Sequence, residues 1–188
     1  MKWDFKTPGI PDNFFVKGAP ITKEEVRVIT LSKARIKENS TIYDVGAGTG
    51  SISIEAALLA RNGKVFSIEK NPERISLIKK NIKKFGVSNI EVVEGEAPEV
   101  LRALPRADRI IIGGSGGRIR RILKKCDGKL NDNGVVVINA VKLDTLRDST
   151  STLQKLSYNF RVTQVHINKF DGIAKALSTI FIIDAEKR

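Results

Sequence analysis

The stretch "TIYDVGAGTG", residues 41–50, joins a short apolar run to three glycines at alternate positions. Its first half is rich in strand-forming residues, and "SISIEAALLA", residues 51–60, follows with a helical pattern. Glycines between a strand and a helix allow a tight turn and let a ligand approach the backbone. The stretch therefore predicts a strand–turn–helix unit of an α/β fold, with a ligand site at the turn.

Strand and helix patterns alternate along the rest of the chain. Further strands are predicted at 64–69, 89–95, 107–114, 134–141, 160–168 and 177–184, and helices at 71–86, 97–104, 117–126 and 143–157. No helix separates the last two strands, which residues 169–176 connect. This order predicts an α/β, Rossmann-like, doubly wound sheet of seven strands, mostly parallel, with an antiparallel C-terminal hairpin strand.

The same patterns predict one domain over residues 1–188. Its N-terminal extension, residues 1–35, ends in a helix around 22–36, and its core covers residues 41–184. No secretory signal and no apolar stretch of membrane-spanning length is found, which predicts a cytoplasmic protein without membrane contact. The net charge of +12 attracts polyanions, either nucleic acid or a small polycarboxylate.

The glycine turn departs from the dinucleotide-binding fingerprint G-x-G-x-x-G, because its third glycine, Gly50, comes one residue early. Asp44, directly before the turn, suits a ligand with a positive amine or accepts N–H bonds from the loop backbone. Glu69 ends the next predicted strand, where an acid accepts hydrogen bonds from ribose hydroxyls. S-adenosylmethionine has a ribose and an ammonium group but no phosphate, so it fits these residues better than a dinucleotide.

With these motifs, residues 41–184 resemble the class I S-adenosylmethionine-dependent methyltransferases. Three further stretches narrow the resemblance to the cobalt-precorrin-6B methyltransferases (decarboxylating) of the cobalamin pathway: "GIPDNFFVKGAPITKEEVR" (9–27), "GEAPEVL" (95–101) and "IIGGSGG" (111–117). The resemblance implies methyl transfer to carbon-15 of a cobalt-precorrin macrocycle, with loss of the ring C acetate as carbon dioxide. It also implies a homo-oligomer, a tetramer, and the companion corrin methyltransferase of the pathway as a partner.

The resemblance further implies which residues hold S-adenosylmethionine. They are Thr22, Asp44, Gly46, Ala47, Gly48, Thr49, Gly50, Glu69, Glu96 and Ala97. Members of the family commonly have Asp where Glu69 stands, and many have Cys where Ala47 stands. The longer acid still reaches a ribose, and position 47 contributes mainly backbone.

The motif "GGSGG", residues 113–117, follows the fourth predicted strand. Many nucleic-acid methyltransferases have Asn or Asp, two prolines and an aromatic residue here, which grip a flipped base. This loop instead offers backbone N–H groups at a helix start, which suits anions, with Arg118, Arg120 and Arg121 nearby. We expect a polycarboxylate corrinoid substrate to bind at Gly113, Gly114, Ser115, Gly116, Gly117 and Arg118.

No catalytic acid or base can be assigned from the sequence, and no metal site is expected. The single cysteine, Cys126, is expected to pack in the core, and the single histidine, His166, to have a structural role. Trp3 and Phe5 are expected to cover an apolar surface or contact a neighbouring subunit.

Three other functions remain open on the sequence. They are an RNA (tRNA) methyltransferase, which the positive charge suggests, a protein isoaspartate carboxyl methyltransferase with a similar glycine loop, and a cofactor-binding subunit without turnover. Nucleic acid is the less favoured partner, because the chain has neither the proline–aromatic motif nor an appended RNA-binding module.

Overall fold

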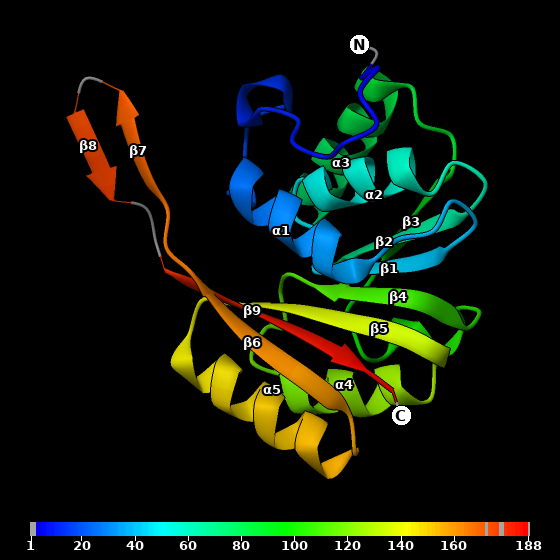
Figure 1. Ribbon diagram of the computed structural model, residues 1–188. Helices are drawn as coiled ribbons and strands as arrows, with labels where there is room; N and C mark the ends of the chain where they lie inside the picture. The colour runs from blue at the N-terminus through cyan, green and yellow to red at the C-terminus, as the bar shows by residue number, and fades with distance from the viewer. Residues whose placement is uncertain (1–2, 172, 177–178, 188) are drawn as a thin grey trace.

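A seven-stranded sheet runs through the molecule, with helices on both faces (Figure 1). The computed structural model describes residues 3–171, 173–176 and 179–187. The strands of this sheet are β1 (Thr41–Val45), β2 (Lys64–Glu69), β3 (Ile90–Glu94), β4 (Ala107–Ile112), β5 (Leu130–Ala140), β6 (Asn159–Val165) and β9 (Ile180–Glu186). Their order is β3-β2-β1-β4-β5-β9-β6, and β9 alone runs antiparallel to its neighbours. The predicted fold class is confirmed.

Five α-helices cover the two faces of the sheet. Helices α1 (Glu24–Ala34), α2 (Ser51–Leu59) and α3 (Pro72–Phe85) lie on one face, and α4 (Ile119–Asp127) and α5 (Leu143–Lys155) on the other (Figure 1). Helix α3 has the ends that its sequence predicts: the Asn71 side chain accepts the Arg74 N–H, and Gly86 ends the helix with φ of +66°. Local capping chemistry therefore sets its boundaries.

The central strands are buried on both sides. Ile110 and Ile112 of β4 belong to the apolar cluster beneath α4, whereas Ile111 and Val137 belong to the cluster beneath α1 and α2. Successive side chains of a strand point to opposite faces, so a sheet covered twice needs apolar residues at nearly every position. The unbroken apolar runs of the sequence are thus explained, and the carboxyl ends of the strands are left to form the site.

Two predicted elements have different bounds in the structure. The prediction of a helix at 97–104 is wrong, because only a 3-10 turn, η2 (Val100–Arg102), forms there. Prolines at both ends of this segment leave room for a single turn. Strand β5 begins four residues before the prediction, because Leu130 already pairs with Ala107 of β4. The register then shifts across a stretch that contains Asn133 in the left-handed conformation, which is typical of a bulge or turn.

The connection expected at 169–176 contains a hairpin of its own. Strands β7 (Asn168–Asp171) and β8 (Ile173–Ala176) pair antiparallel and project beyond the ends of β6 and β9 (Figure 1). Strand β6 ends at Val165, so His166 lies after it, with Nδ1 3.0 Å from Thr179 Oγ1. Residues 172, 177 and 178, which the predicted connection and last strand include, lie outside the described residues.

Candidate functional site

The glycine loop after β1 is held by backbone hydrogen bonds and by a contact with a second glycine loop. The Gly46 and Ala47 N–H groups both donate to the Ile68 carbonyl, each at 3.0 Å. Gly46 has φ of +73°, and a Cβ at this position would lie 2.5 Å from the Gly114 carbonyl oxygen. Glycine is required here because the two loops touch backbone to backbone.

Glu69 orders this loop from the end of β2. Its carboxylate is only 5% exposed; Oε2 accepts the Gly48 N–H at 2.9 Å, and Oε1 accepts the Lys70 and Asn71 N–H groups at 3.0 Å. An acid that is buried and accepts three backbone N–H bonds is part of the loop architecture, not a solvated strand end. Its remaining lone pairs are available to a ligand hydroxyl.

Asp44 is buried beside the same loop. Its Oδ2 accepts the Ser53 hydroxyl at 2.6 Å, while Oδ1 has no hydrogen-bond partner among the described residues. Burial raises the pKa of Asp44 from 3.8 to about 6, against the lowering effect of the Ser53 hydrogen bond. The sequence left two roles open for Asp44, and the loop N–H groups described above donate elsewhere. A buried, incompletely bonded carboxylate that lines a cavity suits a positively charged ligand group.

Replacing Asp44 with asparagine is expected to stabilise the protein. The raised pKa means that the folded state holds its proton more tightly than the unfolded state, so stability falls as pH rises from about 3.8 to about 6. Asparagine carries no charge and can still accept the Ser53 hydrogen bond. The variant should gain about 1–3 kcal/mol in unfolding free energy at pH 7, and little at pH 4, as measured by urea denaturation.

Asp184 provides the matched control for this prediction. It is also buried, but Arg161 lies 2.7 Å and Lys33 3.5 Å from its carboxylate oxygens. Asp184→Asn should therefore destabilise the protein at pH 7. A stability gain in both variants, or in neither, would contradict the conclusion that the buried charge of Asp44 lowers the stability of the protein at neutral pH.

Three cavities meet at Gly114, which lines all of them. The first, about 460 Å³, lies over the glycine loop; the second, about 160 Å³, extends past Glu69; the third, about 560 Å³, lies between the 113–117 loop and the start of α5. Of the predicted cofactor residues, the first cavity is lined by Thr22, Asp44, Gly46, Ala47, Gly48 and Thr49, and the second by Gly46, Glu69, Glu96 and Ala97.

The predicted substrate loop lines the third cavity through all five of its residues, Gly113 to Gly117. Two predicted site residues line none of the three. Gly50 instead begins helix α2, where its carbonyl accepts the Ile54 N–H. Arg118 begins α4.

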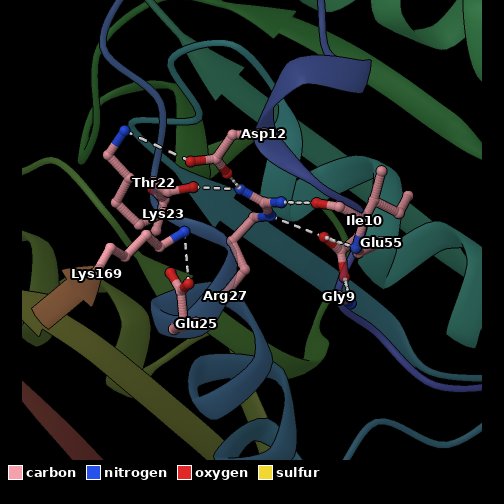
Figure 2. Close-up of polar contacts among 9 residues, drawn as sticks. All are labelled: Gly9, Ile10, Asp12, Thr22, Lys23, Glu25, Arg27, Glu55 and Lys169. Atoms are coloured by element: carbon pink, nitrogen blue, oxygen red, sulfur yellow. Dashed lines mark hydrogen bonds and ion pairs between the residues drawn. The ribbon is translucent and has the colours of Figure 1, made fainter. Parts of the chain in front are cut away.

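Arg27 holds the N-terminal segment in place (Figure 2), next to Thr22, which lines the first cavity. The side chain is fully buried, with Nε 2.7 Å from Glu55 Oε1 and Nη1 2.7 Å from Asp12 Oδ1. Its other N–H groups donate to the carbonyls of Ile10 and Thr22. Thr22 was predicted as a site residue, but the guanidinium that holds its backbone in place was missed.

Asn81 connects the same segment to the glycine loop. From the middle of α3, its Oδ1 accepts the Val16 N–H at 2.8 Å and its Nδ2 donates to the Thr49 carbonyl at 2.9 Å. The sequence contained one signal for this role, a polar residue among the apolar positions of an amphipathic helix. Asn81 therefore joins Thr49, which lines the first cavity, to the N-terminal segment.

A family model described as a precorrin methyltransferase domain matches residues 13–178. The chain belongs to this family. It is 40% identical, over all of both chains, to a probable cobalt-precorrin-6B C(15)-methyltransferase (decarboxylating) of Saccharolobus solfataricus.

Solved structures of precorrin enzymes superpose closely on this family member. Precorrin-6y C5,15-methyltransferase of Geobacter metallireducens is 42% identical with a TM-score of 0.93, and the match covers 96% of this chain and 98% of that one. Precorrin 8w decarboxylase of Methanobacterium thermoautotrophicum is 31% identical with a TM-score of 0.87, over 94% and 98%. The predicted family resemblance is confirmed.

In this precorrin methyltransferase domain, the arginines after the "GGSGG" loop are paired with acids. Arg118 lies 2.7 Å from Glu96 and 3.2 Å from Glu99, and Arg121 lies 3.0 Å from Glu99. Arg120 lies 2.7 Å from Asp148. Their charges are thus partly compensated within the protein, which the sequence did not predict. A substrate contact of Arg118 stays a prediction.

Within the described residues, no group of three or more potential ligands could hold a metal ion, and no helix is long and apolar enough to cross a membrane. Cys126 is buried in the core cluster beneath the sheet, as predicted, and burial raises the pKa of its thiol to about 12. Such a thiol stays protonated at neutral pH and contributes packing.

Proposed function

We propose that this chain is an S-adenosylmethionine-dependent C-methyltransferase of cobalamin biosynthesis. It methylates carbon-15 of a cobalt-precorrin macrocycle and removes the ring C acetate as carbon dioxide. Two findings support the substrate assignment. The chain is 40% identical over its full length to a relative named for this reaction, and it superposes on precorrin enzymes. Assembly into a homo-oligomer, and with a companion corrin methyltransferase, stays a prediction.

The observation that carries the proposal is that three neighbouring cavities share Gly114 in their linings. The residues of the first two fit S-adenosylmethionine: unpartnered Asp44 Oδ1 suits its ammonium, Glu69 suits its ribose hydroxyls, and Gly48 leaves open space above the loop. The third cavity, which Asn139 and Val141 share with the first, would place a large substrate against the cofactor.

When bound, the cofactor supplies a methyl group whose bond to sulfur breaks as the new bond to carbon forms. The protein contributes proximity and orientation, which are sufficient to accelerate such a displacement greatly. The two glycine loops set the distance between the cavities, and Glu69 fixes the first loop through Gly48. For the acetate, the electrons of the broken carbon–carbon bond pass into the conjugated macrocycle, and the remaining carbon takes up a proton.

Replacing Glu69 with glutamine is expected to weaken cofactor binding by about 1–3 kcal/mol, because ribose hydroxyls lose a charged acceptor. Glutamine keeps the length of the side chain and one carbonyl acceptor for the loop. Isothermal calorimetry measures the dissociation constant, and thermal unfolding shows whether the fold is kept. Glu94, exposed at the end of neighbouring β3, gives a charge-matched control in Glu94→Gln. Equal affinities for both variants and the wild type would remove Glu69 from the cofactor site.

The rival function is RNA methylation, suggested by the net charge of +12. The third cavity, however, has no aromatic residue in its lining and so no platform on which a flipped base would stack. An RNA-binding surface would also give affinity that falls steeply with salt, roughly with the number of phosphates neutralised. A compact corrinoid should give a shallower dependence.

Incubation of the purified protein with the cobalt-corrin precursor and methyl-labelled cofactor tests the proposal. Transfer of label to the corrinoid and release of carbon dioxide are expected, and tRNA under the same conditions should take up no label. If tRNA were labelled and bound tightly at physiological salt while the corrinoid was ignored, the RNA function would replace the proposed one.

A further inference from the structure

The third cavity lies mostly between the 113–117 loop and the connection from β5 to α5. Its lining contains four charged residues, Lys142, Asp144, Arg147 and Asp148. Arg147 lies 3.2 Å from Asp144 and 3.3 Å from Asp148, and Asp148 also pairs with Arg120. Three of the four charges therefore belong to one compensated network at the start of α5.

Lys142 is the exception in this lining. Within the part of the chain that the structure describes, its side chain has no ion pair or hydrogen bond, and it is exposed to solvent at the residue before α5. The two acids of the same lining are paired with Arg147, so no ion pair has to break before Lys142 binds an anion that enters the cavity. The arginines of α4, by contrast, would have to leave Glu96, Glu99 or Asp148 to bind a substrate carboxylate.

Apolar side chains flank this lysine. Val141 is 63% exposed and Leu143 is 70% exposed, although both are large aliphatic residues, and of the two only Val141 lines the third cavity. Val141 also lines the first cavity, so the apolar surface continues toward the loop over which the cofactor would bind. A cation beside an exposed aliphatic residue in one cavity lining matches a ligand with an apolar ring and carboxylate side chains.

Asn139 adds a second donor for an anion at the junction of the cavities. It is 7% exposed and lines both the first and the third cavity. Its Oδ1 lies 3.0 Å from Thr30 Oγ1, which leaves Nδ2 buried with no acceptor among the described residues. A buried N–H group without a partner costs free energy, and a carboxylate oxygen in the cavity would satisfy it.

From these observations we propose that Asn139, Val141 and Lys142, and not the arginines at the start of α4, form the carboxylate-recognition wall of the substrate site. Lys142 binds one carboxylate of the substrate, Asn139 Nδ2 binds another at the cavity junction, and Val141 contacts the ring. The inference rests on the proposed function, because it specifies how the same site recognises a polycarboxylate macrocycle.

The test is steady-state methyl transfer to the cobalt-corrin precursor by Lys142→Gln, with Lys142→Arg and Lys155→Gln for comparison. Lys155 is exposed at the other end of α5, so Lys155→Gln removes the same charge far from the cavity. Lys142→Gln should raise KM for the corrinoid about fivefold, the effect of an exposed ion pair, with kcat and cofactor affinity within about twofold. Lys142→Arg should restore KM, and Lys155→Gln should leave it unchanged.

Salt gives a second readout that a packing defect would not change. Added sodium chloride should raise the KM of the wild type toward that of Lys142→Gln, because screening weakens the same ion pair. Equal KM for Lys142→Gln and the wild type, or an equal rise for Lys142→Gln and Lys155→Gln, overturns the inference while the proposed function stands. A wild type that transfers no methyl group to the corrinoid overturns both.

Discussion

Valine in place of Gly48 is expected to abolish cofactor binding in a folded protein, weakening it by at least about 100-fold, or about 3 kcal/mol. A Cβ at Gly48 meets only the Pro20 carbonyl, at 3.9 Å, so the backbone leaves open space there. That space lies in the first cavity, where a branched side chain would occupy the volume of the methionine portion. Calorimetric titration with S-adenosylmethionine measures the loss.

The conformational cost of this substitution can be separated from its effect on the site. Gly48 has φ of +60°, a region that valine disfavours. Gly86, at the end of α3, has φ of +66° and no atom within 4 Å of its added Cβ, yet it lines none of the three cavities. Gly86→Val should lose similar stability and bind the cofactor normally. Wild-type affinity in a folded Gly48→Val protein would exclude this loop from the cofactor site.

Replacing Arg27 with methionine is expected to remove about 3–5 kcal/mol of unfolding free energy, because buried Glu55 loses its cation. The carbonyls of Ile10 and Thr22 lose their donor at the same time, so the N-terminal segment should detach from α1 and α2 (Figure 2). Urea denaturation measures the stability, and calorimetry should show weaker cofactor binding because Thr22 lines the first cavity.

A double variant distinguishes the buried ion pair from simple packing. Arg27→Met with Glu55→Met removes both charges, and it should recover part of the stability lost by Arg27→Met alone. Arg120→Met, which breaks an exposed pair with Asp148, should change stability little. If the double variant were less stable than the sum of the two single variants predicts, the ion pair would not be the source of the effect.

The sequence by itself determined the order of the core elements and the place of the glycine loop between β1 and α2. Three local patterns were sufficient: the run from Thr41 to Gly50, the caps of α3 and the continuous apolar strands. Such patterns predict the same helices and strands wherever both faces of the sheet are buried. The prediction of Glu69 beside the glycine loop was also accessible, because parallel neighbouring strands end at the same edge of the sheet. Its three backbone hydrogen bonds were not.

Sequence patterns failed where the chain turns on short or polar segments. The helix expected at 97–104 is a single turn, and β5 extends back to Leu130 because that residue pairs with Ala107 of β4, on the other side of a register shift that spans Asn133. The hairpin of β7 and β8 was expected as a plain connection. Strand formation depends on a partner strand, which a single segment of sequence does not contain.

Only the tertiary structure decided which charged side chains are free and which are paired. The arginines after "GGSGG" are the prominent cations in the sequence, yet the fold places Glu99 and Asp148 beside them, whereas Lys142 has no partner among the residues that the structure describes. Arg27 meets Glu55, and Asn139 meets Thr30, across long separations in the chain. Periodicity identifies the face on which a residue lies, whereas a pairing between charges depends on distances that only the packed helices and loops determine.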